Sequence, residues 1–275
     1  LNIIENFDLK RSGHNSAETI HILSEAMQRA YADRAEYHGD PDYFDVPVKT
    51  LLNKQYSSDL STTIFDTRTP DGQIFEGNLT KYDESPDTTH FSIIDSKGNA
   101  VSNTYTLGSS FGSGVTIEKG GFLMNNQMRN FSHFYGQEGA EYGTSKANRL
   151  EPGKRMISTQ TPTLVFDTNG DLMMILGSPG GGRIPNIITQ VISNVIDHEM
   201  SFTEAVIAPR INQRLESKLQ LETGFSPDTI ELLKQKGHEP ETSTTMGRVQ
   251  PIFLEQENMF GVADTRRPGA LAKGN

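Results

Sequence analysis

The stretch Thr88-Thr89-His90-Phe91-Ser92-Ile93-Ile94-Asp95 reads as a β-strand that begins directly behind the polar, turn-rich segment Glu84-Ser85-Pro86-Asp87. A tight turn, Ser96-Lys97-Gly98-Asn99, follows, and Ala100 to Leu107 supplies the partner strand of a hairpin. Polar segments of this kind lie on the surface, where a chain can be cut. The pattern therefore places Thr88 at the start of a strand and next to an accessible peptide bond.

A threonine in this position has a chemical use if the chain is cut in front of it. A threonine hydroxyl is a poor nucleophile without a base, and a freed α-amino group is the nearest base available. The Thr88 hydroxyl can make that cut itself by attacking the carbonyl carbon of Asp87 in an N-to-O acyl shift, after which water hydrolyses the ester. The plainer interpretation is that Thr88 and Thr89 are β-branched strand residues, and the dipeptide alone favours it.

A second feature is the glycine-rich turn Gly177-Ser178-Pro179-Gly180-Gly181-Gly182-Arg183. Acyl transfer builds negative charge on a carbonyl oxygen, and converging backbone N–H groups at the start of a helix stabilise such charge. We expect Gly180 and Gly181 to supply these N–H groups. A phosphate loop would need a following Gly-Lys-Ser/Thr, and a dinucleotide fingerprint a Gly-x-Gly-x-x-Gly order; this turn has neither. The two features together predict a self-cleaving amidohydrolase.

Composition limits the class of protein. The 275 residues are 34% hydrophobic with 25 glycines, which indicates a mixed α/β globular protein with many turns, long enough for one large domain or two. A net charge of −10 disfavours nucleic acid and anionic membranes as partners. The chain has no cysteine, so disulfides, thiol catalysis and cysteine-ligated zinc are excluded. It starts at Leu1 without a signal-peptide pattern, and we expect it to begin within a longer protein whose export signal lies upstream.

Several further elements are predicted. A helix spans Gly13 to Arg34, with Asn15 as N-cap and Glu18 as its capping-box partner. A helix with a broad apolar stripe follows the glycine-rich turn. Another begins at Ser226-Pro227 and stops at Gly237. Further strands are expected at Gly121 to Asn125, Pro162 to Phe166 and Leu172 to Leu176, whereas Gln55 to Asp87 reads as an exposed linker.

Two features allow more than one interpretation. The carboxylates of Gly39-Asp40-Pro41-Asp42 and Asp45 could bind calcium, but the spacing of a twelve-residue calcium loop is missing, and turn chemistry is favoured. His90 lies two residues after Thr88 and could act as a base, but packing is the favoured role. The seven histidines show no metal-binding spacing.

Several stretches in order resemble the γ-glutamyltranspeptidase family along the whole chain. They are Leu1-Asn2-Ile3-Ile4-Glu5-Asn6-Phe7-Asp8, Tyr31-Ala32-Asp33-Arg34, Gly39-Asp40-Pro41, Thr88-Thr89-His90-Phe91-Ser92, Asn125-Asn126-Gln127-Met128 and Gly177-Ser178-Pro179-Gly180-Gly181. The resemblance implies an α+β N-terminal-nucleophile (Ntn) hydrolase with a four-layer αββα sandwich. Residues 1–87 would be the C-terminal part of a large subunit and residues 88–275 the small catalytic subunit, together forming one αββα domain after autocatalytic cleavage between Asp87 and Thr88.

The resemblance also implies the reaction and its partners. The substrate would be a small-molecule γ-glutamyl amide of the glutathione type, and the acceptor water or an amino acid. No cofactor or metal is expected. The active form would be a heterodimer of the two halves of one precursor, periplasmic or secreted by family habit. Because the upstream part of the large subunit would contribute an arginine that clamps the substrate carboxylate, the chain alone is expected to process slowly or not at all; Arg34 and Arg183 are not assigned that role.

By the same resemblance, each catalytic role falls on a numbered residue. Thr88 would be the nucleophile and, through its new amine, the base; Thr106 would orient it. Gly180 and Gly181 would form the oxyanion hole. The substrate-binding residues would be Gln127 for the α-amino group, Ser158 and Thr159 for the α-carboxylate, and Asn130 and Gly108 at the amino-acid end.

The chain departs from the family pattern at three of these positions. Thr159 replaces a usual serine and keeps the hydroxyl, Asn130 replaces a usual aspartate, and Gly108 stands where asparagine is frequent. A charge-assisted hydrogen bond contributes about 1.5–3 kcal/mol against about 1 kcal/mol for a neutral one, so Asn130 predicts weaker selection for an ammonium group. Two alternatives follow: an acylase of the same mechanism acting on glutaryl groups, as in cephalosporin side chains, or a non-catalytic protein that binds γ-glutamyl compounds.

Overall fold

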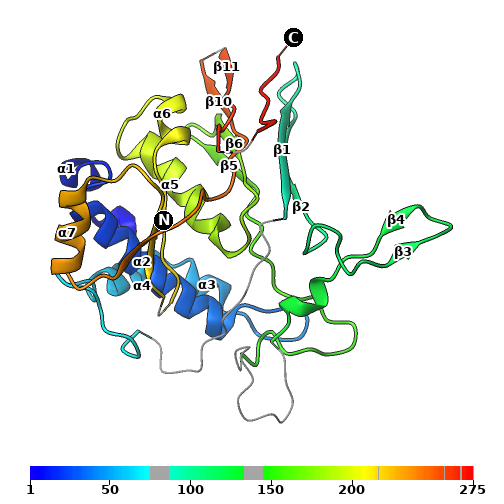
Figure 1. Ribbon diagram of the computed structural model, residues 1–275, viewed down its shortest axis with the longest axis horizontal. Coiled ribbons are helices and arrows are strands. Elements are labelled where there is room, and N and C mark those ends of the chain that lie inside the picture. Colours follow the sequence, from blue (N-terminus) through cyan, green and yellow to red (C-terminus); the bar gives the residue numbers. More distant parts are fainter. Residues whose placement is uncertain (75–86, 133–144, 216, 257, 267, 275) are drawn as a thin grey trace. The chain divides into compact units, whose positions relative to one another are not determined.

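The computed structural model describes residues 1–74, 87–132, 145–215, 217–256, 258–266 and 268–274. Contacts divide the chain into two compact units, each assembled from segments that are far apart in the sequence (Figure 1). The first unit comprises Leu1–Asp83, Met128–Ser158 and Ile211–Ser243. The second comprises Glu84–Gln127, Thr159–Arg210 and Thr244–Asn275.

The first unit is mainly helical, with one small sheet. Its helical elements are η1 (Ile4–Asn6), α1 (Leu9–Ser12), α2 (Ala17–Tyr37), α3 (Val48–Leu51), α4 (Lys54–Ser61) and α7 (Pro227–Gln235). In its sheet, β8 (Leu219–Leu221) pairs antiparallel with β7 (Ile211–Asn212) and parallel with β9 (Pro240–Thr242). Buried side chains of α2 pack with those of β7, β8 and α7 in one hydrophobic core. That core joins residues before position 87 to residues far beyond it.

Helix α2 begins later than predicted. Ser16 is the N-cap, and its hydroxyl accepts a hydrogen bond from the Thr19 amide at 3.1 Å. Asn15 has φ +52°, a left-handed conformation that asparagine tolerates. The predictions of Asn15 as N-cap and of Glu18 as its capping-box partner were therefore wrong. A complete capping box occurs at Ser201 and Glu204, at the start of α6 (Phe202–Ile207).

The prediction of an exposed linker from Gln55 to Asp87 was wrong in its first part, because α4 extends to Ser61. Asn53 caps this helix by accepting hydrogen bonds from the amides of Gln55 and Tyr56. The helix is polar and short, which left no clear hydrophobic period in the sequence. Residues 75–86 of the predicted linker lie outside the described residues.

The second unit contains most of the strands. β5 (Thr163–Phe166), β6 (Leu172–Leu176), β10 (Ile252–Glu255) and β11 (Asn258–Gly261) form an antiparallel sheet in the order β11-β10-β6-β5. Two hairpins accompany it, β1 (Thr89–Ile94) with β2 (Ala100–Tyr105) and β3 (Thr116–Ile117) with β4 (Phe122–Leu123). The element η2 (Gln127–Asn130) crosses from this unit to the first. The predicted strands are confirmed, with ends that differ by up to two residues.

The glycine-rich turn ends in the short helical element η3 (Gly181–Arg183), and α5 (Ile184–Ile196) follows it and packs beside α6 (Figure 1). The apolar stripe of α5 is buried with side chains of β6 and β10, including Ile187, Val191, Leu176 and Phe253. The predicted helices after Gly182 and after Ser226 are thus confirmed; Ser226 caps α7, and Pro227 is its first residue.

The β1–β2 hairpin turns its polar face inward. Ser92 Oγ donates to the carbonyl of Gln250 at 2.6 Å, and Ser102 Oγ donates to that of Leu176 at 2.9 Å. The outward face carries the exposed apolar side chains of Phe91, Ile93, Val101 and Tyr105. These hydroxyl contacts fix the hairpin beside β6 and its following turn. Within the described residues, no helix has the length and apolar character needed to cross a membrane.

Candidate active site

β1 begins at Thr89, one residue later than predicted, so the half-buried Thr88 stands immediately before it. The hydroxyl of Thr106 donates a hydrogen bond to the carbonyl oxygen of Asp87 at 2.8 Å. The amide of Gly108 donates to the Thr106 hydroxyl at 2.9 Å, which directs the hydroxyl proton away from Gly108 and toward that carbonyl. The carbonyl in front of Thr88 is therefore polarised by a fixed donor.

Gly108 has a backbone role in this arrangement. Its φ is +94°, and a Cβ atom added there would lie 2.0 Å from Oδ1 of Asn126. The Asn126 carboxamide is itself held by the Ser109 amide at 3.0 Å and by the Ser109 hydroxyl at 2.9 Å. An asparagine at position 108 would thus require a rearranged loop, and glycine here lets the backbone approach both Thr106 and Asn126.

Gln127 lies next to the same threonine. Its Nε2 donates to the carbonyl oxygen of Thr106 at 2.9 Å, and its own amide donates to Asn125 Oδ1 at 3.0 Å. The structure therefore brings four of the sequence-predicted residues together at the start of β1 and the end of β2: Thr88, Thr106, Gly108 and Gln127.

The glycine-rich turn contains two residues with positive φ at the start of a helical element. Gly180, with φ +142°, is the N-cap of η3, and Gly181, with φ +56°, is its first residue; η3 leads directly into α5. The first N–H groups of a helix lack intrahelical partners and carry partial positive charge. A Cβ atom on Gly180 would lie 3.1 Å from Cδ1 of Ile187, so the backbone runs directly over α5.

A strap formed by residues 247–250 holds this turn from behind. The Arg248 amide donates to the buried hydroxyl of Ser178 at 2.9 Å, and the Gln250 amide donates to the Gly177 carbonyl at 3.1 Å. Gly247 has φ +65°, and a Cβ atom there would meet Ser178 Oγ at 2.5 Å. The strap therefore contacts the turn too closely for a side chain at this position.

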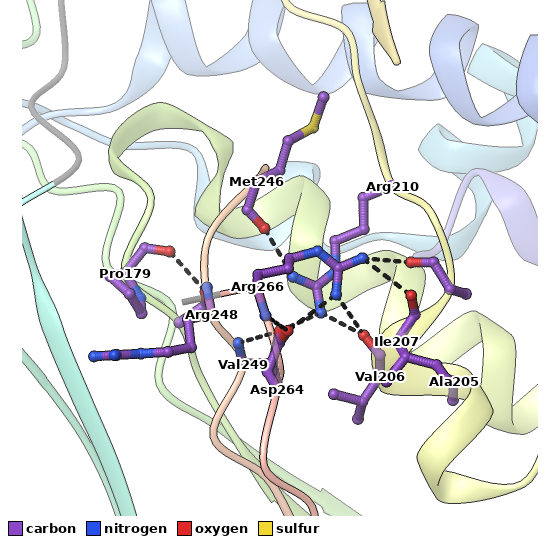
Figure 2. A network of polar contacts seen from close by, with 12 residues as sticks. Pro179, Ala205, Val206, Ile207, Arg210, Met246, Arg248, Val249, Asp264 and Arg266 are labelled. Atoms are coloured by element: carbon purple, nitrogen blue, oxygen red, sulfur yellow. Dashed lines mark hydrogen bonds and ion pairs between the residues drawn. The ribbon is translucent and has the colours of Figure 1, made fainter. Parts of the chain in front are cut away.

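A buried ion-pair network anchors the strap (Figure 2). Asp264 Oδ2 accepts from Arg210 Nη2 at 2.8 Å and from the Val249 amide at 2.9 Å. Arg210 also donates to the Met246 carbonyl at 2.7 Å, and Arg266 donates to Asp264 Oδ1 at 3.1 Å. Burial alone would raise the pKa of Asp264, but the two arginines and the Val249 amide outweigh burial and lower it. Sequence reasoning missed this network because its members lie in irregular segments without a motif.

His90 is a packed core residue, as the favoured interpretation predicted. Its ring nitrogens contact the hydroxyls of Thr104 at 2.7 Å and Ser92 at 3.1 Å. The ring lies against Gly177, where a Cβ atom would come within 2.2 Å of it. Burial lowers the pKa of His90 to about 4, so the side chain is neutral at neutral pH.

The remaining predicted residues lie on both sides of the unit boundary. Asn130 and Ser158 belong to the first unit and Thr159 to the second. Asn130 is half-buried, and its Nδ2 contacts Met156 Sδ at 3.6 Å, whereas Ser158 is exposed.

The acidic loop serves as a turn, as favoured. Asp40 accepts from the Asp42 amide at 3.1 Å, and Arg155 pairs with both carboxylates at 2.5 Å. The hydrogen bonds from Arg155 lower the pKa of Asp40. Among the described residues, no three His, Cys, Asp or Glu side chains are grouped as metal ligands.

Comparison with known sequences identifies the family. The family model described as Gamma-glutamyltranspeptidase matches residues 1–274. The chain belongs to the γ-glutamyltranspeptidase family. The glutathione hydrolase proenzyme of Escherichia coli (strain K12) is 41% identical over 283 residues, which cover 100% of this chain and 48% of the relative. The Acylase ACY 1 proenzyme of Pseudomonas sp. (strain SE83) is 35% identical, covering 86% of this chain and 40% of the relative.

Solved structures agree with this membership. The γ-glutamyltranspeptidase from Pseudomonas nitroreducens complexed with L-DON has a TM-score of 0.61 at 37% identity, covering 68% of this chain and all of that one. The cephalosporin acylase from Bacillus halodurans has a TM-score of 0.80 at 26% identity, covering 100% of this chain and 48% of that one. The α+β Ntn-hydrolase class is confirmed by these neighbours. This family member spans about half the length of the curated relatives it matches.

Proposed function

We propose that the protein containing this chain hydrolyses or transfers γ-glutamyl groups after cutting itself between Asp87 and Thr88. The observation that carries the proposal is the hydrogen bond from Thr106 Oγ1 to the Asp87 carbonyl oxygen, at 2.8 Å. This carbonyl is the one that the Thr88 hydroxyl would attack. Family membership supports the same reaction.

Thr106 contributes to the cut through charge stabilisation. Attack of Thr88 Oγ on the Asp87 carbonyl carbon turns the carbonyl oxygen into an oxyanion, and a donor already in place stabilises that charge without reorganisation. The C–N bond then breaks, the nitrogen takes up the hydroxyl proton, and an ester remains. Water hydrolyses the ester to the Asp87 carboxylate and restores the Thr88 hydroxyl beside its free amine.

In the mature enzyme, the Thr88 amine accepts the proton of its own hydroxyl, which attacks the γ-carbonyl of the substrate. The N–H groups of Gly180 and Gly181 stabilise the oxyanion, and the leaving amine takes the proton. Water or an amino acid then releases the γ-glutamyl group from Thr88. By family analogy, the amino-acid end of the substrate is assigned to Gln127, Asn130, Ser158, Thr159 and the Gly108 loop.

The first unit supports a heterodimer of the cleaved halves. Its core packs α2 against β8 and α7, which lie on opposite sides of the cut. His21 Nδ1 contacts His238 Nε2 at 2.8 Å, and Lys236 pairs with Glu18 at 2.8 Å. Residues 1–87 and 88–275 would therefore stay associated after cleavage. We assign the assembled enzyme a four-layer αββα sandwich and a periplasmic or secreted location, both by family analogy.

A second candidate function is an acylase of the same mechanism. Asn130 offers a neutral amide where an aspartate would neutralise the substrate ammonium, which reduces the advantage of γ-glutamyl over glutaryl groups. The similarity to an acylase proenzyme favours keeping this candidate.

The test uses the full-length gene product and its Thr88→Ala variant. Intact mass spectrometry over one day is expected to show two fragments meeting at Asp87/Thr88 in the parent and none in the variant. Kinetics with γ-glutamyl and glutaryl anilides then assign the acyl group: a strong γ-glutamyl preference excludes the acylase. A parent that stays uncut and inactive, yet binds γ-glutamyl ligands, would refute catalysis and support the non-catalytic alternative.

A further inference from the structure

Asn148 is a fully buried polar residue that connects two predicted substrate-binding segments of the first unit. Its Nδ2 donates to the carbonyl oxygen of Asn130 at 2.7 Å. Its Oδ1 accepts from the amide of Ile157 at 3.1 Å, immediately before Ser158. One carboxamide thus joins the end of η2 to the segment that leads into Ser158 and Thr159.

The backbone around Asn148 is fixed as well. The Ser132 amide donates to the Asn148 carbonyl at 2.9 Å, and Ser132 forms a bridge with Arg149. A Cβ atom on Gly39 would lie 2.2 Å from the Ala147 carbonyl oxygen, so the backbones of Gly39 and Ala147 are in close contact. The Asn148 side chain therefore starts from a rigid position.

The far end of the same loop is held by Asp40. The Arg155 amide donates to Asp40 Oδ2 at 2.8 Å, and its guanidinium adds bonds at 3.0 and 2.5 Å. Tyr43 donates to the Pro152 carbonyl at 3.0 Å. Loop 145–157 is thereby clamped at both ends, and the Asn148 carboxamide sets the spacing between its two neighbours.

We propose that Asn148 is a positioning residue that fixes the distance between the amine-binding side, at Asn130, and the carboxylate-binding side, at Ser158. The inference rests on the proposed function, because it uses the roles assigned there. A carboxamide is suited to this work since it donates and accepts at once. An aspartate of the same length accepts but, when ionised, cannot donate.

Two substitutions separate the two bonds. Asn148→Asp keeps an acceptor for the Ile157 amide but places a carboxylate against the Asn130 carbonyl. Asn148→Ala removes both bonds, together with a longer one from Nδ2 to Ser132 Oγ at 3.4 Å. Glutaryl donors carry the carboxylate but lack the amine, so Asn148→Asp is expected to raise KM for γ-glutamyl anilide about tenfold with little change for glutaryl anilide. Asn148→Ala is expected to raise KM for both.

The experiment measures kcat and KM for both anilides in the mature full-length enzyme. The lost contacts bind the ground state and the transition state equally, so kcat is expected to stay within about threefold of the parent value. Hydrogen exchange of the Ile157 amide is expected to accelerate in Asn148→Ala but not in Asn148→Asp. Asn258→Asp, the same chemical change at an exposed position of β11, serves as the matched control and is expected to leave all values unchanged.

The outcomes distinguish failure of the proposed function from failure of the positioning role of Asn148. A parent without turnover would refute the proposed function, and the positioning role with it. An active parent whose γ-glutamyl-to-glutaryl KM ratio is unchanged in Asn148→Asp would refute the positioning role alone. If Asn148→Asp does not fold, Asn148→Ala removes the same side-chain bonds without adding a charge and is expected to raise KM for both donors; unchanged KM values would overturn the proposal.

Discussion

In each unit, an arginine–aspartate pair anchors a segment that carries or supports predicted site residues. The two pairs differ in how deeply their side chains are buried. Arg210 and Asp264, behind the glycine-rich turn, are 2% and 0% exposed. Arg155 and Asp40, at the end of the Asn148 loop, are 66% and 1% exposed. A buried pair that loses one partner leaves an uncompensated charge, whereas water replaces the lost partner of an exposed guanidinium. The turn should therefore depend on its pair much more than the loop does.

The largest effect is expected from breaking the buried pair. Asp264→Ala leaves Arg210 and Arg266 without their carboxylate and the Val249 amide without its acceptor. We expect a loss of about 3–5 kcal/mol of unfolding free energy, measured by urea titration. The matched control is Asp171→Ala, at an exposed position of the turn between β5 and β6. Equal effects of the two substitutions would contradict the comparison.

The network behind that prediction shows what sequence reasoning cannot reach. Asp264 and Arg210 are 54 positions apart, and neither lies in a periodic element or motif. Asn148 is equally silent in the sequence, because its two shortest side-chain hydrogen bonds are to a backbone carbonyl and a backbone amide that any residue could supply. Contacts made by irregular backbone depend on the whole packed unit, and no local pattern encodes them.

In contrast, reaction chemistry and local sequence pattern predicted structure correctly where a single segment determines it. β6 was predicted to the residue, because its apolar run lies between a turn and the glycines. Thr88 was selected by its chemistry and Thr106 by the family resemblance, and the structure places the Thr106 hydroxyl on the peptide carbonyl in front of Thr88. The N-cap of α2 was misplaced by one residue, since Asn15 and Ser16 are both good caps and only the left-handed φ of Asn15 decides between them.

An intermediate loss of unfolding free energy is expected on acidification. The pH at which it occurs should distinguish the contribution of His90 from that of Asp264. Burial lowers the pKa of His90 from 6.5 to about 4, so the folded state binds fewer protons than the unfolded state between those values. The contribution of neutral His90 to the unfolding free energy is therefore complete above pH 6.5 and is lost as the pH falls toward 4. The pKa of Asp264 is lowered from its usual value of 3.8, so the contribution of its carboxylate to the unfolding free energy is lost only at lower pH.

The measurement is the unfolding free energy between pH 7 and pH 3 for the parent and His90→Asn. The variant removes the group that titrates, and its curve is expected to be flatter between pH 6.5 and 4, although it is less stable at pH 7. Asp264→Ala should keep the slope of the parent in that window. A His90→Asn curve parallel to that of the parent would show that His90 does not cause the slope.

The smallest stability effect is expected from the exposed pair. Arg155→Ala removes the guanidinium partner of Asp40 and Asp42, but the buried Asp40 keeps the backbone amides of Asp42 and of residue 155 as donors. Since the arginine itself is open to solvent, we expect the lost pair to cost about 0.2–1 kcal/mol. Salt should weaken the contribution further, because exposed charges are screened within about 8–10 Å at ordinary ionic strength. The unfolding free energy of Arg155→Ala and the parent, measured at low salt and at 1 M sodium chloride, should therefore converge at high salt. The difference between parent and Asp264→Ala should persist there, because buried charges are screened much less. If Arg155→Ala instead cost as much as Asp264→Ala at both salt concentrations, the hydrogen bonds to the buried Asp40 would outweigh the exposure of the arginine, and the two pairs would be equivalent anchors.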